Sequence, residues 1–321
     1  MFALRCLGVS LAFFLAQYCL FSAVIARSWA WWSRVTQSWR PRHVANFLLG
    51  LRMLPLLAAL ASTAIFVLPS FLLLEPRATN EGAGEAPTVL SVCCLLLVGF
   101  GLQRAIRAQA RSSRVVSEWL REATPLPAQE NLAGNPFPVF QIRPPVPALT
   151  VAGVRSPRVL VSSAAATLLD PREMRTALQH EIAHIRHRDN LKKLLFNFTA
   201  FPGMAALEAA WSEAGEIAAD DAAVANCGDA LDLASALIKL SRLGPAPVPA
   251  VLTTGLVQSS NTALNFRVER LLAWQQAPAD DSFPRFPKFV IPTTLAMVVL
   301  IFASYGAVLE RMHEVTEWLV R

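Results

Sequence analysis

Residues 170–190 read DPREMRTALQHEIAHIRHRDN, and this stretch decides how the soluble part of the chain folds. Asp170 and Glu173 form a capping box with proline between them, so we expect a helix that begins at residue 171. His180 and His184 are one helical turn apart and differ by about 40° around the helix axis. Their imidazoles therefore face one point and could hold one metal ion.

Glu181 lies about 100° around the same helix, where its carboxylate could reach a water on that metal without binding the metal itself. The pattern H-E-x-x-H also arises by chance, and in such chains the histidines are surface residues that bind no metal. Here, three of the five histidines of the chain fall within eight residues of one capped helix. This concentration favours a metal site.

A third ligand is expected from a second helix, at about Trp211 to Cys227. Glu216 and Asp220 lie one turn apart on one face of it, in a stretch rich in alanine. The alternative is a solvated acidic face, because further carboxylates lie nearby at Glu213, Asp221 and Asp229.

The other histidines are not expected to be ligands. His187 lies on the same face as His180, but about 10.5 Å further along the axis, too far for one ion with bonds of about 2.0–2.1 Å. We interpret it as part of a flanking basic cluster. His43 and His313 lie elsewhere in the chain and are interpreted as structural residues.

The composition indicates a membrane protein. The 321 residues are 54% hydrophobic and 16% charged, whereas soluble domains are about 45–50% apolar and about 25% charged. Four uncharged runs are expected to be transmembrane helices: residues 6–26, 53–74, 86–103 and 289–309. The first run could instead be a signal peptide cleaved after Val24-Ile25-Ala26.

The positions of Lys and Arg predict the orientation. We expect a basic, Trp-rich cytoplasmic loop at 27–52, an extracytoplasmic loop at 75–85, a cytoplasmic domain at 109–284 and a short extracytoplasmic tail at 310–321. Both termini then face outward. This topology and attraction to membrane lipid account for the net charge of +6, so no direct nucleic-acid binding is expected.

Short elements precede the metal-binding helix. Residues 122–147 are loop-like with a strand at 139–142, and two apolar runs at 149–154 and 158–162 predict a hairpin or a pair of edge strands. The run at 158–162 is either an edge to which an extended peptide could pair or a buried core strand. A helical pattern covers about 170–243, and a last helix is expected at about 261–275.

Four segments carry a resemblance to a known family. The stretches 154–161, 178–190, 211–220 and 267–272 resemble the BlaR/MecR-type (antirepressor) membrane zinc metallopeptidases, over about residues 150 to 275. The chain departs from many relatives at Ala219 and Glu213, where they have Cys and a basic residue. The penicillin-binding sensor domain that follows the last membrane helix in the beta-lactam sensors is not expected, since only about a dozen residues follow that run here.

The resemblance implies a mainly α multi-pass membrane protein with four transmembrane helices and an inserted small α+β zincin-like (gluzincin) metalloprotease domain. It implies Zn²⁺ held by His180, His184 and Glu216, with Glu181 as general base and Asp220 orienting a ligand imidazole. Neither tyrosine lies in the soluble domain, so the candidate transition-state stabilisers are Arg267, Arg270 or an Asn side chain.

The implied activity is zinc endopeptidase cleavage at the cytoplasmic face of a bacterial cytoplasmic (inner) membrane. The substrate would be a cytoplasmic repressor of the BlaI/MecI-like winged-helix class, or the chain itself, in signal transduction. One alternative is a membrane quality-control or processing metalloprotease. The other is a non-catalytic membrane signalling scaffold, which the intact motif disfavours.

Overall fold

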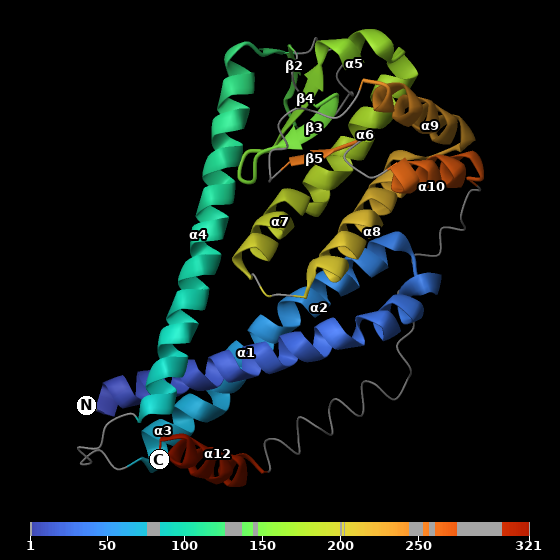
Figure 1. Cartoon of the computed structure of the whole chain (residues 1–321). Coiled ribbons are helices and arrows are strands. Elements are labelled where there is room, and N and C mark those ends of the chain that lie inside the picture. Colours follow the sequence, from blue (N-terminus) through green and yellow to red (C-terminus); the bar gives the residue numbers. More distant parts are fainter. Residues whose placement is uncertain are drawn as a thin grey trace.

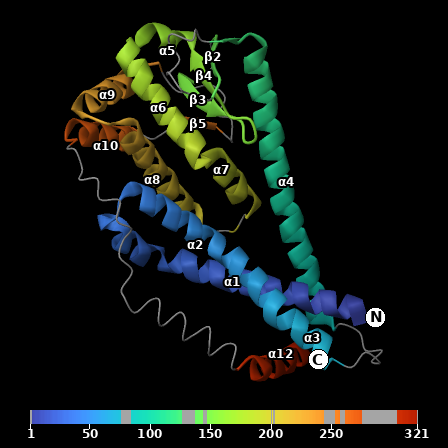
Figure 2. The same cartoon turned by 180° about the vertical axis from the view of Figure 1, so that it is seen from behind.

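The computed structural model is mostly helical, with one small sheet (Figure 1). It describes residues 2–75, 84–125, 137–143, 147–199, 201, 203–243, 253–256, 261–274 and 304–320. Long helices α1, α2 and α4 form one part of the molecule, and the sheet with helices α5 to α10 forms the other. Figure 2 shows the same arrangement from behind.

Within the described residues, three helical segments are long and apolar enough to cross a membrane: Phe2–Ser38, Pro41–Leu74 and Glu85–Arg121. The first contains α1 (Phe2–Val35), and the second contains α2 (Pro41–Ser62), a π-helical turn (Thr63–Val67) and α3 (Leu68–Leu74). The third is α4 (Glu85–Arg121). The predicted fourth span, 289–309, falls mainly outside the described residues, and helix α12 (Tyr305–Val320) covers only its last residues.

The prediction of a connecting loop at 27–52 is wrong in its conformation. Helix α1 continues to Val35, a single 3₁₀ turn follows at Thr36–Ser38, and α2 begins at Pro41. Residues 27–35 contain no glycine or proline to end a helix, and Pro41 supplies the fixed φ that suits a first helical position. The turn between the two helices is therefore short.

Helix α4 also runs past its predicted end at residue 103 to Arg121, and its 37 residues give a length of about 55 Å. The boundary predicted at 109 thus lies inside a continuous helix. Residues 104–121 contain no glycine or proline. Apolar side chains near the end of α4, among them Val116 and Trp119, pack on Leu160 of the sheet.

The sheet has the order β1-β2-β4-β3-β5. Strands β3 (Leu149–Ala152) and β4 (Arg158–Ser162) are antiparallel, so the predicted hairpin is confirmed. Strand β2 (Val139–Ile142) matches the predicted strand and pairs in parallel with β4. Strand β4 is therefore interior, which favours the core-strand alternative over the peptide-pairing edge. Strands β1 (Thr124–Pro125) and β5 (Thr253–Gly255) lie at the two edges.

The helical stretch predicted over 170–243 is divided into four helices: α6 (Pro171–His187), α7 (Asp189–Phe198), α8 (Ala205–Ala223) and α9 (Cys227–Ser241). Helix α5 (Ser163–Leu168) precedes them. The bounds of α10 (Asn261–Leu272) nearly match those of the last helix that the sequence predicted, at about 261–275. The helix predicted at Trp211 to Cys227 begins earlier and ends at Ala223. The side chain of Asn226 accepts a hydrogen bond from Asp229 N and begins α9.

Two apolar cores hold these parts in place. The first joins the sheet to α6, α9 and α10 and includes Val159, Leu178 and Leu237, all with 0% exposure. The second joins α1 and α2 to α7 and α8 and includes Leu48 and Trp211. Helix α8 thus lies between α6 and the long helix α2 (Figure 1).

Candidate metal centre

Helix α6 presents His180 and His184. It begins at Pro171, as the capping box predicts: the Asp170 side chain accepts from Glu173 N, and the Glu173 side chain accepts from Asp170 N. The two histidines are 0% and 3% exposed, and their Nε2 atoms are 3.1 Å apart. Both imidazoles therefore direct the same nitrogen to one point.

Helix α8 brings Glu216 to this point. Its Oε2 lies 3.6 Å from His180 Nε2, and its Oε1 lies 3.6 Å from His184 Nε2. Two ligands that bind one tetrahedral zinc ion at about 2.0–2.1 Å stand about 3.4 Å apart. The three separations, 3.1, 3.6 and 3.6 Å, bracket that value, so the donors fit one such ion.

Glu181 lies beside this group and has no exposure. Both of its carboxylate oxygens are buried without a hydrogen-bond partner among the described residues. Burial raises the pKa of Glu181 to about 8, since the opposing charges of His184 and Arg267 do not offset the loss of water. An unpartnered buried carboxyl is costly in a core, but it suits a group that receives a proton in a reaction.

Each imidazole is backed by a carboxylate at its other nitrogen. His180 Nδ1 lies 2.9 Å from Asp220 Oδ1, and His184 Nδ1 lies 2.7 Å from Asp189 Oδ2. Such outer contacts fix the ring orientation and tautomer of a metal-binding histidine. The sequence predicted this role for Asp220 but not for Asp189.

The place of Asp189 depends on an unusual backbone conformation. Arg188 has a φ of 55° and separates α6 from α7, so the chain turns sharply and returns Asp189 to His184. A left-handed arginine leaves little sequence signal. The available signal was the carboxylate five residues after His184.

Arg267 binds two carboxylates of α8, Glu216 and Asp220. From α10, its Nε and Nη2 donate to Asp220 at 2.7 and 2.6 Å, and its Nη1 donates to Glu216 Oε2 at 2.9 Å and to Leu256 O at 3.1 Å. Its exposure is 2%. Arg270, the other candidate stabiliser, instead forms an ion pair with Asp221 at the partly exposed surface of α8.

These charges keep the carboxylates ionised. Burial alone would raise the pKa of Glu216, but His184, His180 and Arg267 outweigh it and hold this pKa well below its usual range. The same competition, dominated by Arg267 after burial, lowers the pKa of Asp220. Glu216 therefore stays in the form that binds a cation.

The other histidines lie apart from this group. Among the described residues, His180, His184 and Glu216 form one set of donors able to share an ion, and His187 is not part of it. His313 forms another such set with Glu75 and Glu317, at the end of the molecule where both termini lie (Figure 1). No sequence pattern indicated this second cluster, and His313 was expected to be a structural residue.

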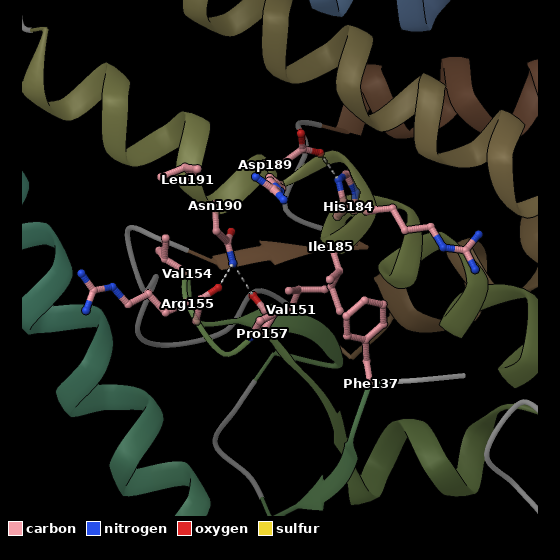
Figure 3. A pocket seen from close by; sticks show the side chains of 13 residues that line it. Phe137, Val151, Val154, Arg155, Pro157, His184, Ile185, Asp189, Asn190 and Leu191 are labelled. Atoms are coloured by element: carbon pink, nitrogen blue, oxygen red, sulfur yellow. Dashed lines mark hydrogen bonds and ion pairs between the residues drawn. The ribbon is translucent and has the colours of Figure 1, made fainter. Parts of the chain in front are cut away.

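A cavity of about 440 Å³ opens beside His184, on the side where Asp189 lies. Figure 3 shows that the turn after β3 and the corner between α6 and α7 form its walls. The Asn190 amide donates to Val151 O and Gly153 O at 3.4 and 3.1 Å and joins the two walls. The Arg155 side chain points away from the cavity (Figure 3).

One family model matches part of this chain. Residues 128–204 match the model of Peptidase family M48. The matched segment contains the sheet strands β2 to β4 and all of α6, and therefore His180, Glu181 and His184, but it ends before Glu216. No curated protein matches the chain.

Proposed function

We propose that the chain is an integral membrane zinc endopeptidase in which His180, His184 and Glu216 bind the metal. One observation carries the proposal. Two imidazole nitrogens and a carboxylate, from α6 and α8, meet within 3.6 Å of one another, and a further carboxylate supports each imidazole. This is the donor set of a three-ligand catalytic zinc site, and the peptidase family match covers its first two ligands.

The residues of the site divide the chemistry between them. When bound here, zinc polarises the scissile carbonyl and lowers the pKa of water. Glu181 takes a proton from the attacking water and returns it to the leaving amine, as general base and then general acid. Asp220 and Asp189 keep the two imidazoles oriented. The guanidinium of Arg267 donates to Glu216 and Asp220, so we expect a different group to stabilise the oxyanion.

The proposed orientation places the metal centre at the cytoplasmic face of a bacterial cytoplasmic membrane. The part of α4 beyond residue 103 carries Arg104, Arg107, Arg111 and Arg114, and this end of α4 packs against the sheet of the peptidase part. Cytoplasmic segments next to membrane helices are enriched in arginine and lysine. The sheet and metal centre would thus share that side of the membrane.

The proposed physiological role is regulatory proteolysis in signal transduction. Its substrate would be a cytoplasmic repressor of the BlaI/MecI-like class, or the chain itself. This role is supported by the resemblance of the metal-binding segments to the BlaR/MecR-type peptidases.

A second candidate is processing or quality-control cleavage of membrane proteins. The observation that favours it is the family match itself, because residues 128–204 match Peptidase family M48 and the BlaR/MecR-type peptidases are not among the matches. Cleavage of many damaged membrane proteins would support this candidate, whereas cleavage of one repressor at one site would support the first.

The experiment uses the full chain in detergent, with its bound zinc measured. Wild type, Glu181→Ala and Glu213→Ala are incubated with a co-encoded repressor, with unfolded membrane proteins and alone. Glu213 is exposed on the same helix as Glu216 and serves as the matched control. We expect wild type and the Glu213 variant to cleave at least one of these and the Glu181 variant to cleave none. Equal cleavage by all three would refute the proposal.

A further inference from the structure

Arg52 is a buried charge between a membrane helix and the peptidase part. The sequence predicted that Arg52 lies in a basic cytoplasmic loop, but it lies in helix α2 and is 1% exposed. Its Nε lies 2.9 Å from Glu208 Oε1, in the first turn of α8, and its Nη2 donates to Thr199 O, at the end of α7. Arg52 therefore binds the end of one peptidase helix and the start of the next.

A second membrane helix holds the same point. The Tyr18 hydroxyl of α1 donates to Thr199 O at 3.2 Å, and Tyr18 is 4% exposed. Its ring also meets Phe201 edge-on, at 5.8 Å between centroids. The segment that leads into α8 is thus fastened from both α1 and α2.

Apolar contacts extend this attachment along α8. Leu207 and Trp211 belong to the core that contains Leu48 and Leu51 of α2. The Phe196 ring, which belongs to this core, lies 5.9 Å from the Arg52 guanidinium and 4.8 Å from the Trp211 ring. Both views show α8 lying along α2 (Figures 1 and 2).

The same helix carries the third donor of the metal centre. Glu216 follows Glu208 by eight residues, about 12 Å along the axis, and α8 is continuous from Ala205 to Ala223. Its opposite faces thus contact α2 and the two histidines. Because a helix moves as a unit, a shift of its first turn changes the separation between Glu216 and the imidazoles.

We propose that Arg52 is a positioning residue for Glu216, through which the membrane helices set the metal affinity of the site. This inference rests on the proposed function, since it takes Glu216 as the third ligand. A stimulus that moves α2 relative to α1 would open the Arg52–Glu208 contact, displace α8 and weaken metal binding. The membrane bundle would thereby regulate the peptidase without contacting its substrate.

The test measures Zn²⁺ affinity of the full chain in lipid nanodiscs by competition with a chelator. The variants are Arg52→Gln, Glu208→Gln and Tyr18→Phe, which remove the charge, its partner and the second hydrogen bond. The matched control is Arg5→Gln, because Arg5 also forms a buried ion pair between membrane segments, 2.9 Å from Glu75, away from α8. The conservative Arg52→Lys keeps the charge.

We expect Arg52→Gln and Glu208→Gln to bind zinc roughly tenfold more weakly, which is the usual effect of removing an outer contact of a metal site. The Tyr18→Phe variant should show a smaller loss of affinity. Arg52→Lys should recover part of the affinity, because an ammonium ion reaches Glu208 without the fork that also binds Thr199. Arg5→Gln should bind like wild type. The visible spectrum of the Co²⁺ form should lose its four-coordinate bands in the Arg52→Gln and Glu208→Gln variants alone.

Wild-type zinc affinity in both Arg52→Gln and Glu208→Gln would overturn the inference. If Arg52→Gln does not fold, Glu208→Gln and Tyr18→Phe decide the matter in the same way. A wild-type chain that binds no zinc would contradict the proposed function itself, so the two failures are distinguishable.

Discussion

The Nδ1 atom of His184 lies 2.7 Å from Oδ2 of Asp189, a residue only five positions later that belongs to a different helix. Asp189 is also 3.0 Å from Lys192 Nζ, through its other oxygen. The Asp189 carboxylate therefore orients the His184 imidazole, and Lys192 in turn orients the carboxylate. The orientation of one proposed ligand is built into the corner between α6 and α7.

The Asp189→Asn variant should bind zinc roughly 10- to 100-fold more weakly, because the neutral amide supports the His184 ring less than a carboxylate does. Chelator competition measures the change. Asp221→Asn is the control, since Asp221 pairs with Arg270 at the surface of α8. Equal affinities for the two variants would show that Asp189 does not support the metal centre.

The left-handed backbone of Arg188, whose φ is 55°, predicts different effects on stability for two substitutions at this position. Arg188→Gly should keep the stability of wild type, because glycine adopts this conformation without a Cβ clash. Arg188→Val should lower the free energy of unfolding by about 1–3 kcal/mol, because a β-branched residue is strained there. Thermal unfolding in detergent tests the pair. A valine variant as stable as the glycine variant would argue against the left-handed corner.

Helix α4 packs closely on α7 at Gly101. A Cβ at this position would overlap the Phe198 carbonyl oxygen, whereas a Cβ at Gly99 would meet open space. Gly101→Ala should therefore lower the melting temperature and Gly99→Ala should not, since both helices would have to separate in the first variant only. The same loss in both variants would point to glycine's effect on helix propensity alone.

Acid should destabilise the start of α6 through Glu173, which is 3% exposed. Burial raises its pKa, but hydrogen bonds from Lys239, Ser235 and Asp170 N outweigh it and place the pKa below the usual 4.5. A carboxyl whose pKa is lowered by folding stabilises the protein at pH values above its unfolded-state pKa. This stabilisation is lost as the pH falls through its folded-state pKa.

The Glu173→Gln variant should accordingly be less stable at neutral pH, by about 1–3 kcal/mol. Its stability should change less than that of wild type as the pH falls from the usual 4.5 through the lower folded-state pKa of Glu173. Melting temperatures over this range measure both effects. A variant whose melting temperature falls with acid as steeply as that of wild type would assign the acid sensitivity to other groups.

Local signals predicted the parts of the site that belong to one element. The capping box placed the start of α6, and helical spacing brought His180 and His184 to one face. The hairpin of β3 and β4 followed from two apolar runs around Pro157, and three of the four predicted spans coincide with long apolar helices. The fourth lies mainly outside the described residues.

The rest depended on contacts between distant segments. The basic, Trp-rich composition of residues 27–52 predicted a cytoplasmic loop, but tertiary packing buries Arg52 against α8, which no local pattern indicates. Arg267 was considered for its charge alone, whereas its position is defined by Asp220 and Glu216 on another helix. Asp189 required a left-handed arginine, a conformation that arginine rarely adopts.

The most direct test of the central claim is the zinc content and zinc affinity of Glu216→Ala beside Glu213→Ala, in the full chain purified in detergent. The account predicts one zinc ion per chain in wild type and in the Glu213 variant. It predicts a loss of affinity in the Glu216 variant greater than the roughly 100-fold that outer contacts contribute. A Glu216 variant that binds one zinc ion with wild-type affinity would contradict the account.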